Sequence, residues 1–170
     1  MSGAVFVDEG WTLAVPDDKE IDELMGWFTD AEAVDRWSGP RFRYPFSRES
    51  FLEDCRIEEI STYCLRNPDG AMAAFGQMYD RYDRGHLARL VTHPGMRRQG
   101  IGERLIRLIM TFARLNSGHE QSSLFVYKDN EPAYRCYLKM GFVVEDYPAD
   151  APLKDKCFFL TRKIDLAESR

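Results

Sequence analysis

Residues that build metal sites or disulfide frameworks are few and scattered in this chain. Its 170 residues include four cysteines with no C-x-x-C pair and three histidines with no H-x-x-x-H pair. Zinc sites and disulfide frameworks depend on closely spaced ligands or on paired cysteines. We therefore expect no metal site, and four free thiols buried in the fold.

Long apolar runs and an excess of positive charge are also missing. No stretch approaches the roughly 20 apolar residues that cross a bilayer, and Met1–Val5 has neither the basic region nor the apolar run of a signal peptide. The chain carries 23 Lys and Arg against 28 Asp and Glu, a net charge of −5, which disfavours a nucleic-acid surface and favours a cationic partner. These absences predict a soluble, cytoplasmic protein that binds neither nucleic acid nor membrane.

What the chain does contain is the composition of an ordinary folded protein. Hydrophobic residues make up 44% and charged residues 30% of the sequence, which is enough apolar surface for one sizeable core. No internal repeat or low-complexity tract divides the chain, and a length of 170 residues predicts a single domain over 1–170.

Hydrophobic spacing and turn signals predict helices first, then a β-meander, then alternating strands and helices. This order indicates a mixed α/β fold around one sheet. Asp18, Asp30 and Ser47 stand where they could cap the first three helices, and Ser47 forms a weak capping box with Ser50. The expected helices are 19–28, 31–37, 48–57, 100–116 and 131–139, and the expected strands are 11–15, 61–66, 71–79, 86–92, 123–127, 142–145 and 156–162.

The most informative segment is the loop between the third meander strand and the long helix that follows it. Gly100 and Gly102 let the backbone turn tightly where the first helical N–H groups point at an anion, and Arg97 and Arg98 add positive charge. A Walker loop would need Lys and Ser or Thr after Gly100, and a dinucleotide fingerprint would need a third glycine at Leu105. The remaining alternative is a glycine-rich turn that only starts a helix.

A second motif, Asn130–Phe142, begins at a junction between a strand and a helix. Pro132 falls in the first helical turn, where its missing N–H does no harm. Ala133, Tyr134 and Tyr137 lie on neighbouring faces of this helix by their spacing. Packing in the core is the ordinary role of a tyrosine at such a position.

Together the two segments resemble the GNAT superfamily of acetyl-CoA-dependent N-acetyltransferases. The first contains Arg97-Arg98-Gln99-Gly100-Ile101-Gly102, and the second matches N-x-x-A-x-x-x-Y-x-K-x-G-F, in the right order and spacing over about the C-terminal half. The resemblance implies a mostly antiparallel mixed sheet with a splayed pair of strands and helices on both faces. It also implies an acyltransferase that moves acetyl from acetyl-CoA to a primary amine by direct transfer in a ternary complex. The alternative is a non-catalytic acetyl-CoA-binding sensor or partner module.

The same resemblance implies where coenzyme A is held. Its pyrophosphate would lie on Arg97–Gly102, and its pantetheine arm would bind the main chain of the preceding strand, which usually carries a bulge. Asn130 would hydrogen-bond the pantetheine, and Tyr137 would reach the thioester sulfur. The expected cofactor-binding residues are Leu90, Val91, Thr92, Arg97, Arg98, Gln99, Gly100, Ile101, Gly102, Asn130, Ala133, Tyr134 and Tyr137.

Two catalytic residues follow from the resemblance, Tyr137 and His86. Tyr137 would protonate the departing thiolate, and the main-chain N–H of Val91 would stabilise the oxyanion. His86 stands where many family members place a glutamate, and an imidazole with a pKa near ~6.5 could serve as the base, directly or through water. A solvent-facing histidine at a strand end is the ordinary alternative.

The amine acceptor would bind between the N-terminal helices and the splayed strands, here about Phe28–Phe46. Trp37 and the aromatic run after it could form a wall for the acceptor or, in the reading we favour, a packed lid over the core. Glu32 and Asp35 could attract an amine or form a solvated face. Arg89, inside an apolar strand, could face the substrate cleft or, in the reading we favour, pair with an acidic residue beneath the helices. The aromatic run consists of Phe42, Tyr44 and Phe46.

The acceptor's identity stays open at this point. The N-terminal segment loosely resembles the branch that acetylates protein N-termini, of the ribosomal-protein-alanine type, and small amines, amino acids, polyamines and aminoglycosides remain alternatives. The sequence also leaves a homodimer open.

Overall fold

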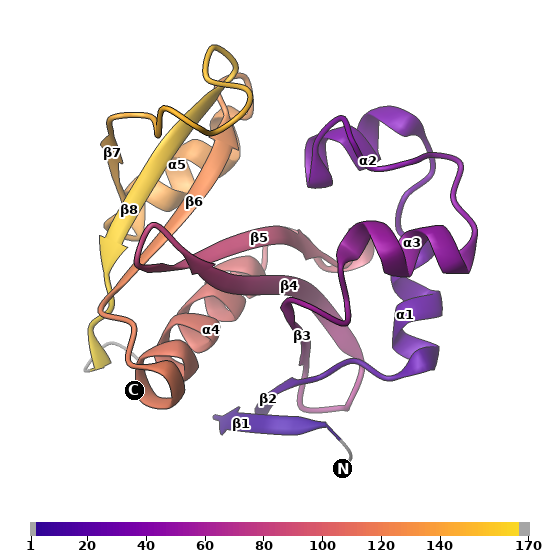
Figure 1. Cartoon of the computed structure of the whole chain (residues 1–170). Coiled ribbons are helices and arrows are strands. Elements are labelled where there is room, and N and C mark those ends of the chain that lie inside the picture. Colours follow the sequence, from indigo (N-terminus) through magenta and orange to yellow (C-terminus); the bar gives the residue numbers. More distant parts are fainter. Residues whose placement is uncertain (1–2, 167–170) are drawn as a thin grey trace.

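The structure, a computed structural model, describes residues 3–166 (Figure 1). The strands are β1 Ala4–Asp8, β2 Trp11–Ala14, β3 Ser61–Arg66, β4 Met72–Arg81, β5 Arg84–Thr92, β6 Gln121–Tyr127, β7 Val143–Glu145 and β8 Cys157–Lys163. The helices are α1 Asp18–Met25, α2 Ala31–Ser38, α3 Arg48–Cys55, α4 Ile101–Ser117 and α5 Glu131–Lys139, with a short 3₁₀ turn at Pro94–Met96.

The described strands form an eight-stranded sheet in the order β1-β2-β3-β4-β5-β6-β8-β7. Neighbouring strands run antiparallel in every pair except β5 with β6, which is parallel. The mostly antiparallel mixed sheet predicted from the sequence is therefore confirmed.

Most predicted elements lie within a few residues of the observed ones, but strand β1 was not predicted. It is short and alternates poorly, and Val7 remains 63% exposed, so its strand conformation comes from pairing with β2 rather than from its own pattern. The predicted cap Asp18 is also wrong. Asp17 caps α1, because its Oδ1 accepts from the Glu20 N–H at 2.8 Å while Glu20 Oε1 accepts from the Asp17 N–H at 3.0 Å.

Two apolar clusters cover the two faces of the sheet. Helix α4 packs its apolar stripe against β2–β5 on one side, whereas α1–α3 enclose an aromatic cluster on the other (Figure 1). The Trp37 ring stacks on Phe28 at 4.3 Å between centroids and on Phe51 at 5.8 Å, and Phe42 lies edge-on to Phe51 at 5.4 Å. The reading of the aromatic run as a packed lid over the core is therefore confirmed for Phe42, whereas Tyr44 is exposed and Trp37 both packs on the core and lines a cavity.

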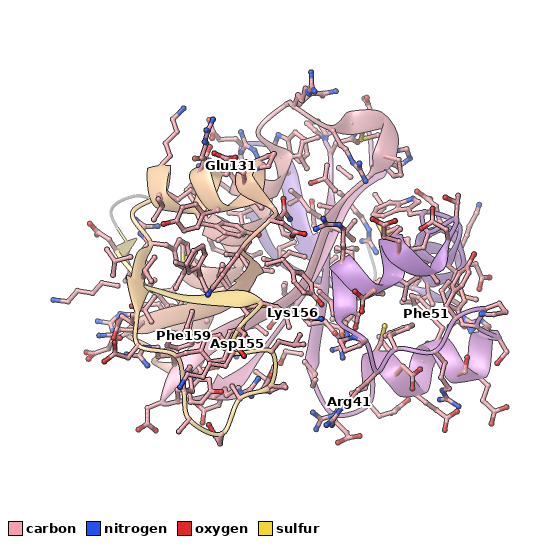
Figure 2. All side chains as sticks on the ribbon, turned by 90° about the horizontal axis from the view of Figure 1, so that it is seen from above. Arg41, Phe51, Glu131, Asp155, Lys156 and Phe159 are labelled. Carbon is pink, nitrogen blue, oxygen red and sulfur yellow. The ribbon has the colours of Figure 1, made fainter. Side chains whose placement is uncertain are left out.

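Strands β5 and β6 pair over a short distance and then diverge. Their paired residues are Gly85 with Ser122 and His86 with Ser123, whereas β6 pairs with β8 along its whole length. Figure 1 shows β6 and β8 swinging away from β5, and Figure 2 places Phe159 of β8 and Phe51 of α3 on opposite sides of the molecule. The splayed pair of strands implied by the family resemblance is present.

A β-bulge in β5 accompanies the divergence. Val91 pairs with Phe75 of β4, yet the next pair along is Ala88 with Gln77, so Arg89 and Leu90 together face Gly76. Arg89 adopts a left-handed conformation with φ of 50°. A Cβ on Gly76 would lie 2.8 Å from Leu90 Cδ2, so the glycine leaves the space that the bulged Leu90 occupies.

Candidate active site

A cavity of about 390 Å³ lies where β5 and β6 separate. Its size falls in the range of small-molecule pockets, which are roughly 300–1,000 Å³. Its walls come from residues 86–90 of β5, residues 124–127 of β6, residues 36–41 at the end of α2, and residues 147, 152 and 153 before β8. Of the residues predicted for cofactor binding and catalysis, it brings together His86, Leu90, Asn130 and Tyr137.

Tyr137 projects from α5 to the cavity. Its ring lies edge-on to Phe142, 5.9 Å between centroids, and burial of the side chain raises the pKa of Tyr137 to about 12. A phenol with this pKa keeps its proton at neutral pH, so Tyr137 faces the cavity as a hydrogen-bond donor.

Asn130 reaches the cavity because it caps α5. Its Oδ1 accepts a hydrogen bond from the Ala133 N–H at 3.5 Å, and the side-chain amide nitrogen has no partner among residues 3–166. An amide fixed in this way presents a donor to a ligand carbonyl. Ala133 and Tyr134 do not line the cavity; Tyr134 packs against Phe158 at 4.8 Å and supports α5 on the sheet.

The backbone beyond the bulge is open on one side. Val91 and Thr92 pair with Phe75 and Ala74 of β4, but in the described part of the chain β6 pairs with β5 only at Gly85 and His86. The outer edge of Leu90–Thr92 can therefore take an extended ligand in the manner of an added strand.

The loop Arg97–Gly102 begins α4 without a side-chain cap. Arg98 and Gly100 adopt left-handed conformations, with φ of 66° and 72°, and Gly100 is the N-cap residue with no side-chain hydrogen bond. The first N–H groups of α4 are thus available to an anion. A Cβ on Gly102 would lie 3.3 Å from Thr92 Oγ1, so this glycine lets the helix start close to the strand.

None of the loop residues Arg97–Gly102 lines the cavity. The candidate phosphate site and the cavity that holds Tyr137 are therefore separate places, connected by the open edge of β5. This layout fits a long ligand with phosphates at one end and a reactive group at the other, as coenzyme A thioesters are.

His86 lies inside the fold, so the reading of it as a solvent-facing residue is wrong. Its side chain is 2% exposed and its Nδ1 lies 2.7 Å from Ser123 Oγ. The rings of Tyr79 and Phe125 surround it at 5.4 and 5.0 Å. Burial, with a smaller contribution from the charge of Arg81, lowers the pKa of His86 to about 3, and its imidazole is neutral at pH 7.

The predicted pairing of Arg89 with an acidic residue is wrong. Its Nε donates to Ser38 Oγ at 2.7 Å and its Nη1 donates to Gln77 Oε1 at 2.8 Å, and burial lowers the pKa of Arg89. Asp54 is the carboxylate whose charge acts on the pKa of Arg89. Its oxygens instead accept hydrogen bonds from the guanidinium of Arg43, at 2.9 and 3.0 Å. Arg89 thus joins the bulge to α2 and to β4 through neutral partners.

Three more hydrogen bonds belong to this network. The Trp37 indole donates to the Arg89 carbonyl at 2.8 Å. Gln77, which is fully buried, donates to the Cys55 carbonyl at 2.8 Å and to Thr62 Oγ1 at 2.9 Å. These hydrogen bonds tie the bulge to α2, to the end of α3 and to the neighbouring strands.

The charged cavity-lining residues that were not predicted from the sequence are arginines. Glu32 and Asp35 do not line the cavity, and Glu32 is exposed beside Arg36. The only sequence signal was Arg89 in an apolar strand, because the others come from segments far apart in the chain. The arginines that line the cavity are Arg36, Arg41, Arg56, Arg81 and Arg89.

The structure also bears on metal ligands, membrane-spanning helices and cysteines. Among residues 3–166, no group of three or more Cys, His, Asp or Glu is placed to hold a metal ion. No helix in this part of the chain is long and apolar enough to cross a membrane. The four cysteines are free, and three are buried, but Cys136 is exposed on α5, whose residues include none that is buried.

An uncapped helix start, an open strand edge and a cavity at the splay together suit a long ligand that carries phosphates at one end. Residues 31–142, more than half of the sequence, match the acetyltransferase (GNAT) family, and the chain belongs to this family. The two sequence motifs predicted this family, and the prediction is confirmed.

A relative in Arabidopsis thaliana, the chloroplastic GCN5-related N-acetyltransferase 6, is 33% identical over 98 residues. The match covers 58% of this chain and 30% of that protein, so the chain spans less than a third of that relative's length.

Solved structures share the fold at low identity. The spermidine N-acetyltransferase of Vibrio cholerae, in complex with CoA and spermine, has a TM-score of 0.71 at 12% identity, covering 92% of this chain and 97% of that one. The PaiA N-acetyltransferase of Thermoplasma acidophilum, in complex with coenzyme A, gives 0.65 at 19%, covering 90% and 98%. The ribosomal-protein-S18-alanine N-acetyltransferase of Escherichia coli gives 0.62 at 19%, covering 91% and 94%.

Proposed function

We propose that the protein moves an acetyl group from acetyl-CoA to the nitrogen of a primary amine, by direct transfer in a ternary complex. One observation carries the proposal: Tyr137 lines the same cavity as Leu90 at the bulge of β5. A proton donor thus faces the place where an open strand edge would deliver a thioester. A module that only binds acetyl-CoA has no need of a donor there.

The residues that would hold acetyl-CoA follow the strand and the two helix starts. We propose that the N–H groups and arginines of Arg97–Gly102 bind the pyrophosphate, with Gly100 and Ile101 at the helix start. The main chain of Leu90, Val91 and Thr92 binds the pantetheine arm, with Asn130 donating to one of its carbonyls. Ala133 and Tyr134 support these contacts by seating α5. Acetyl-CoA supplies the activated acyl group, and no metal takes part in this proposal.

The chain's own groups act on the bonds that change. As the amine nitrogen bonds to the acetyl carbon and the C–S bond breaks, a main-chain N–H on the open edge of Leu90–Thr92 stabilises the charge on the carbonyl oxygen. The predicted donor Val91 pairs with Phe75 of β4, so the N–H groups beside it are better placed. Tyr137 gives its proton to the departing sulfur. The nitrogen releases one proton to water, and the sulfur receives one from Tyr137. Tyr137 then regains a proton from water, so the protons balance.

We do not give His86 the role of base. A group whose pKa is lowered to about 3 holds an abstracted proton weakly at neutral pH, and the rings around His86 favour its neutral form. We propose instead that the amine enters uncharged, that its released proton passes to water, and that neutral His86 forms part of the cavity wall.

The experiment that tests the function uses isotope-labelled acetyl-CoA and mass spectrometry. Pools of α-amine peptides, lysine peptides, amino acids, polyamines and aminoglycosides serve as acceptors. We expect labelled product with the wild-type protein and with Tyr63→Phe, a buried tyrosine outside the cavity, and a loss of at least about 100-fold with Tyr137→Phe. Acetyl-CoA binding without any labelled product would contradict the proposal and favour a sensing module.

A further inference from the structure

The cavity has a charge opposite to that of the chain. The protein has a net charge of −5, yet five arginines line the cavity and the described lining includes no aspartate or glutamate. The loop Arg97–Gly102 does not reach the cavity, so these five arginines are separate from the candidate pyrophosphate site.

Two of the five arginines are neutralised by surface carboxylates outside the lining. Arg36 donates to both carboxylate oxygens of Asp129, at 3.1 and 3.2 Å, and lies 3.9 Å from Glu32. Arg56 forms an ion pair with Glu59 at 3.0 Å. These two guanidinium groups therefore add little net charge to the cavity.

The other three, Arg41, Arg81 and Arg89, have no ion-paired carboxylate among residues 3–166. Arg81 donates to the Tyr79 hydroxyl at 2.9 Å, and its guanidinium lies 4.8 Å from the ring centroid of Tyr82. Arg89 donates only to neutral side chains. Each guanidinium has five N–H donors, so all three retain donors for a further partner.

Arg41 is the exposed member of these three arginines, whereas Arg81 and Arg89 are half-buried. It follows α2 and is exposed; in the view of Figure 2 it lies at the lower edge of the molecule, with the segment that carries Asp155 and Lys156 to one side of it. Neither Asp155 nor Lys156 lines the cavity. The cavity thus has one arginine at a solvent-exposed part of its lining, and Arg81 and Arg89 on the walls formed by β4 and β5.

We propose that the acceptor is a small primary amine that also carries an anionic group, a carboxylate or a phosphate, bound by Arg41, Arg81 and Arg89. This inference rests on the proposed function, whose acceptor it specifies. Guanidinium groups bind both kinds of oxyanion with paired N–H donors. A polyamine, by contrast, would bring further positive charge beside three unneutralised guanidiniums.

The same charges assist the reaction. A bound ammonium near several cations loses its proton more readily, because like charges disfavour the charged form. The arginines would thus lower the pKa of the acceptor amine and raise the fraction that can attack the thioester. This accounts for a cavity that contains neither a carboxylate base nor a histidine with an ordinary pKa.

Matched acceptor pairs test the inference. Each pair has the same amine with and without the anion: an α-amino acid against its carboxamide, and phosphoethanolamine against ethanolamine, with spermidine as the cationic case. We expect kcat/KM to be at least about tenfold higher for the anionic member of one pair, since hydrogen bonds to charged groups contribute at this level. A preference within the amino-acid pair would identify the anion as a carboxylate, and a preference within the phosphoethanolamine pair would identify it as a phosphate.

Variants identify the arginines responsible. Arg41→Gln and Arg81→Gln should each lower kcat/KM for the anionic acceptor by about 10- to 100-fold, with little change for its neutral partner, while Arg81→Lys keeps part of the preference. Arg48→Gln is the control. Arg48 lies outside the cavity and pairs with Asp18 and Asp22 at 3.1 and 3.0 Å, so its replacement should leave the preference unchanged.

The outcomes separate this inference from the proposed function. Faster acetylation of the neutral amines or of spermidine would overturn the anionic acceptor and leave acetyl transfer standing. If no amine is acetylated, acetyl transfer fails, and binding decides the remaining question. A thermal shift produced by phosphoethanolamine or the amino acid, absent with the neutral partner and lost in Arg81→Gln, would support the anion site; no such shift would overturn it.

Discussion

At the end of the candidate site proposed for acetyl-CoA, called the donor end, the proposed binding groups come from three short unbroken segments, Leu90–Thr92, Arg97–Gly102 and Asn130–Tyr137. At the acceptor end, five arginines come from α2, the connection after it, the end of α3, and the strands β4 and β5. The donor end uses mainly backbone groups and helix starts, whereas the acceptor end uses side chains. A donor shared across a family can be recognised by local backbone geometry, while an acceptor is selected by side chains that vary freely on the same frame.

The largest expected effect on turnover comes from replacing Tyr137, which lies where the donor end meets the acceptor end. Tyr137→Phe removes the proton donor and keeps the ring, so kcat should fall by about 100-fold or more, while the dissociation constant for acetyl-CoA changes by less than about twofold. Steady-state kinetics and calorimetry measure the two quantities. An equal loss of turnover and affinity would show that the hydroxyl is structural.

The donor end can be disrupted alone at Gly100. Its φ of 72° and the open space around it mean that Gly100→Leu strains the backbone and places a side chain over the helix start. We expect the dissociation constant for coenzyme A to rise by about tenfold or more, as several charge-assisted hydrogen bonds are weakened.

Gly118 provides a matched control at the other end of α4. It has φ of 73° and likewise nothing within 4 Å of its Cβ position. Gly118→Leu should lose a similar free energy of unfolding, about 1–2 kcal/mol, and keep its affinity for coenzyme A. Equal affinity in both variants would remove the phosphate role from the loop Arg97–Gly102.

A smaller effect is expected at the support of the bulge. Trp37→Phe deletes the hydrogen bond to the Arg89 carbonyl, which should lower the free energy of unfolding by about 1 kcal/mol and raise KM for the acceptor a few-fold. Trp27→Phe is the comparison, because the Trp27 indole N–H is buried without a partner among residues 3–166. Urea unfolding that shows the same loss for both variants would contradict the role of the Trp37 hydrogen bond.

The smallest effect on turnover is expected at His86, whose contribution is to stability. Its pKa falls from about 6.5 in the unfolded chain to about 3 in the fold. Between these values the unfolded chain binds a proton that the folded chain does not, so the free energy of unfolding decreases as the pH falls from 6.5 toward 3. At pH 5 the loss should be about 2 kcal/mol.

His86→Gln should lack this component of the acid destabilisation and retain kcat/KM within about threefold at pH 7.5. Urea unfolding at pH 7.5 and pH 5 measures the first quantity. When kcat/KM is plotted against pH, the acidic limb of the profile should move with the pKa of the acceptor amine. A limb that stays fixed for two amines of different pKa, and disappears in His86→Gln, would restore the histidine as base.

The sequence allowed prediction of what is local. Caps such as Asp30 and Ser47 satisfy neighbouring N–H groups, and the loop and the α5 motif each act over about ten residues, so their order along the chain identifies the donor end. The splay and the bulge came from the family resemblance and were confirmed by the strand register.

What could not be predicted depends on long-range contacts. The partners of Arg89 are fixed by a bulge that turns its side chain toward Ser38 and Gln77. The burial of His86 depends on Phe125 from another strand. No spacing rule joins Arg41 to Arg81, because the cavity brings them together only after β5 and β6 have diverged.

The short contact between β5 and β6 would also make the stability of the fold depend on whether acetyl-CoA is bound. Past His86 and Ser123 the sheet has a seam in which backbone groups of β5 face no strand from residues 3–166. A pantetheine arm in this seam would act as a missing strand and hold the two parts of the sheet together. Occupancy at 100 times the dissociation constant would add about 2.7 kcal/mol to the free energy of unfolding. The melting temperature should then follow the ratio of acetyl-CoA to its dissociation constant, and the protein would be most readily unfolded or degraded when its donor is scarce.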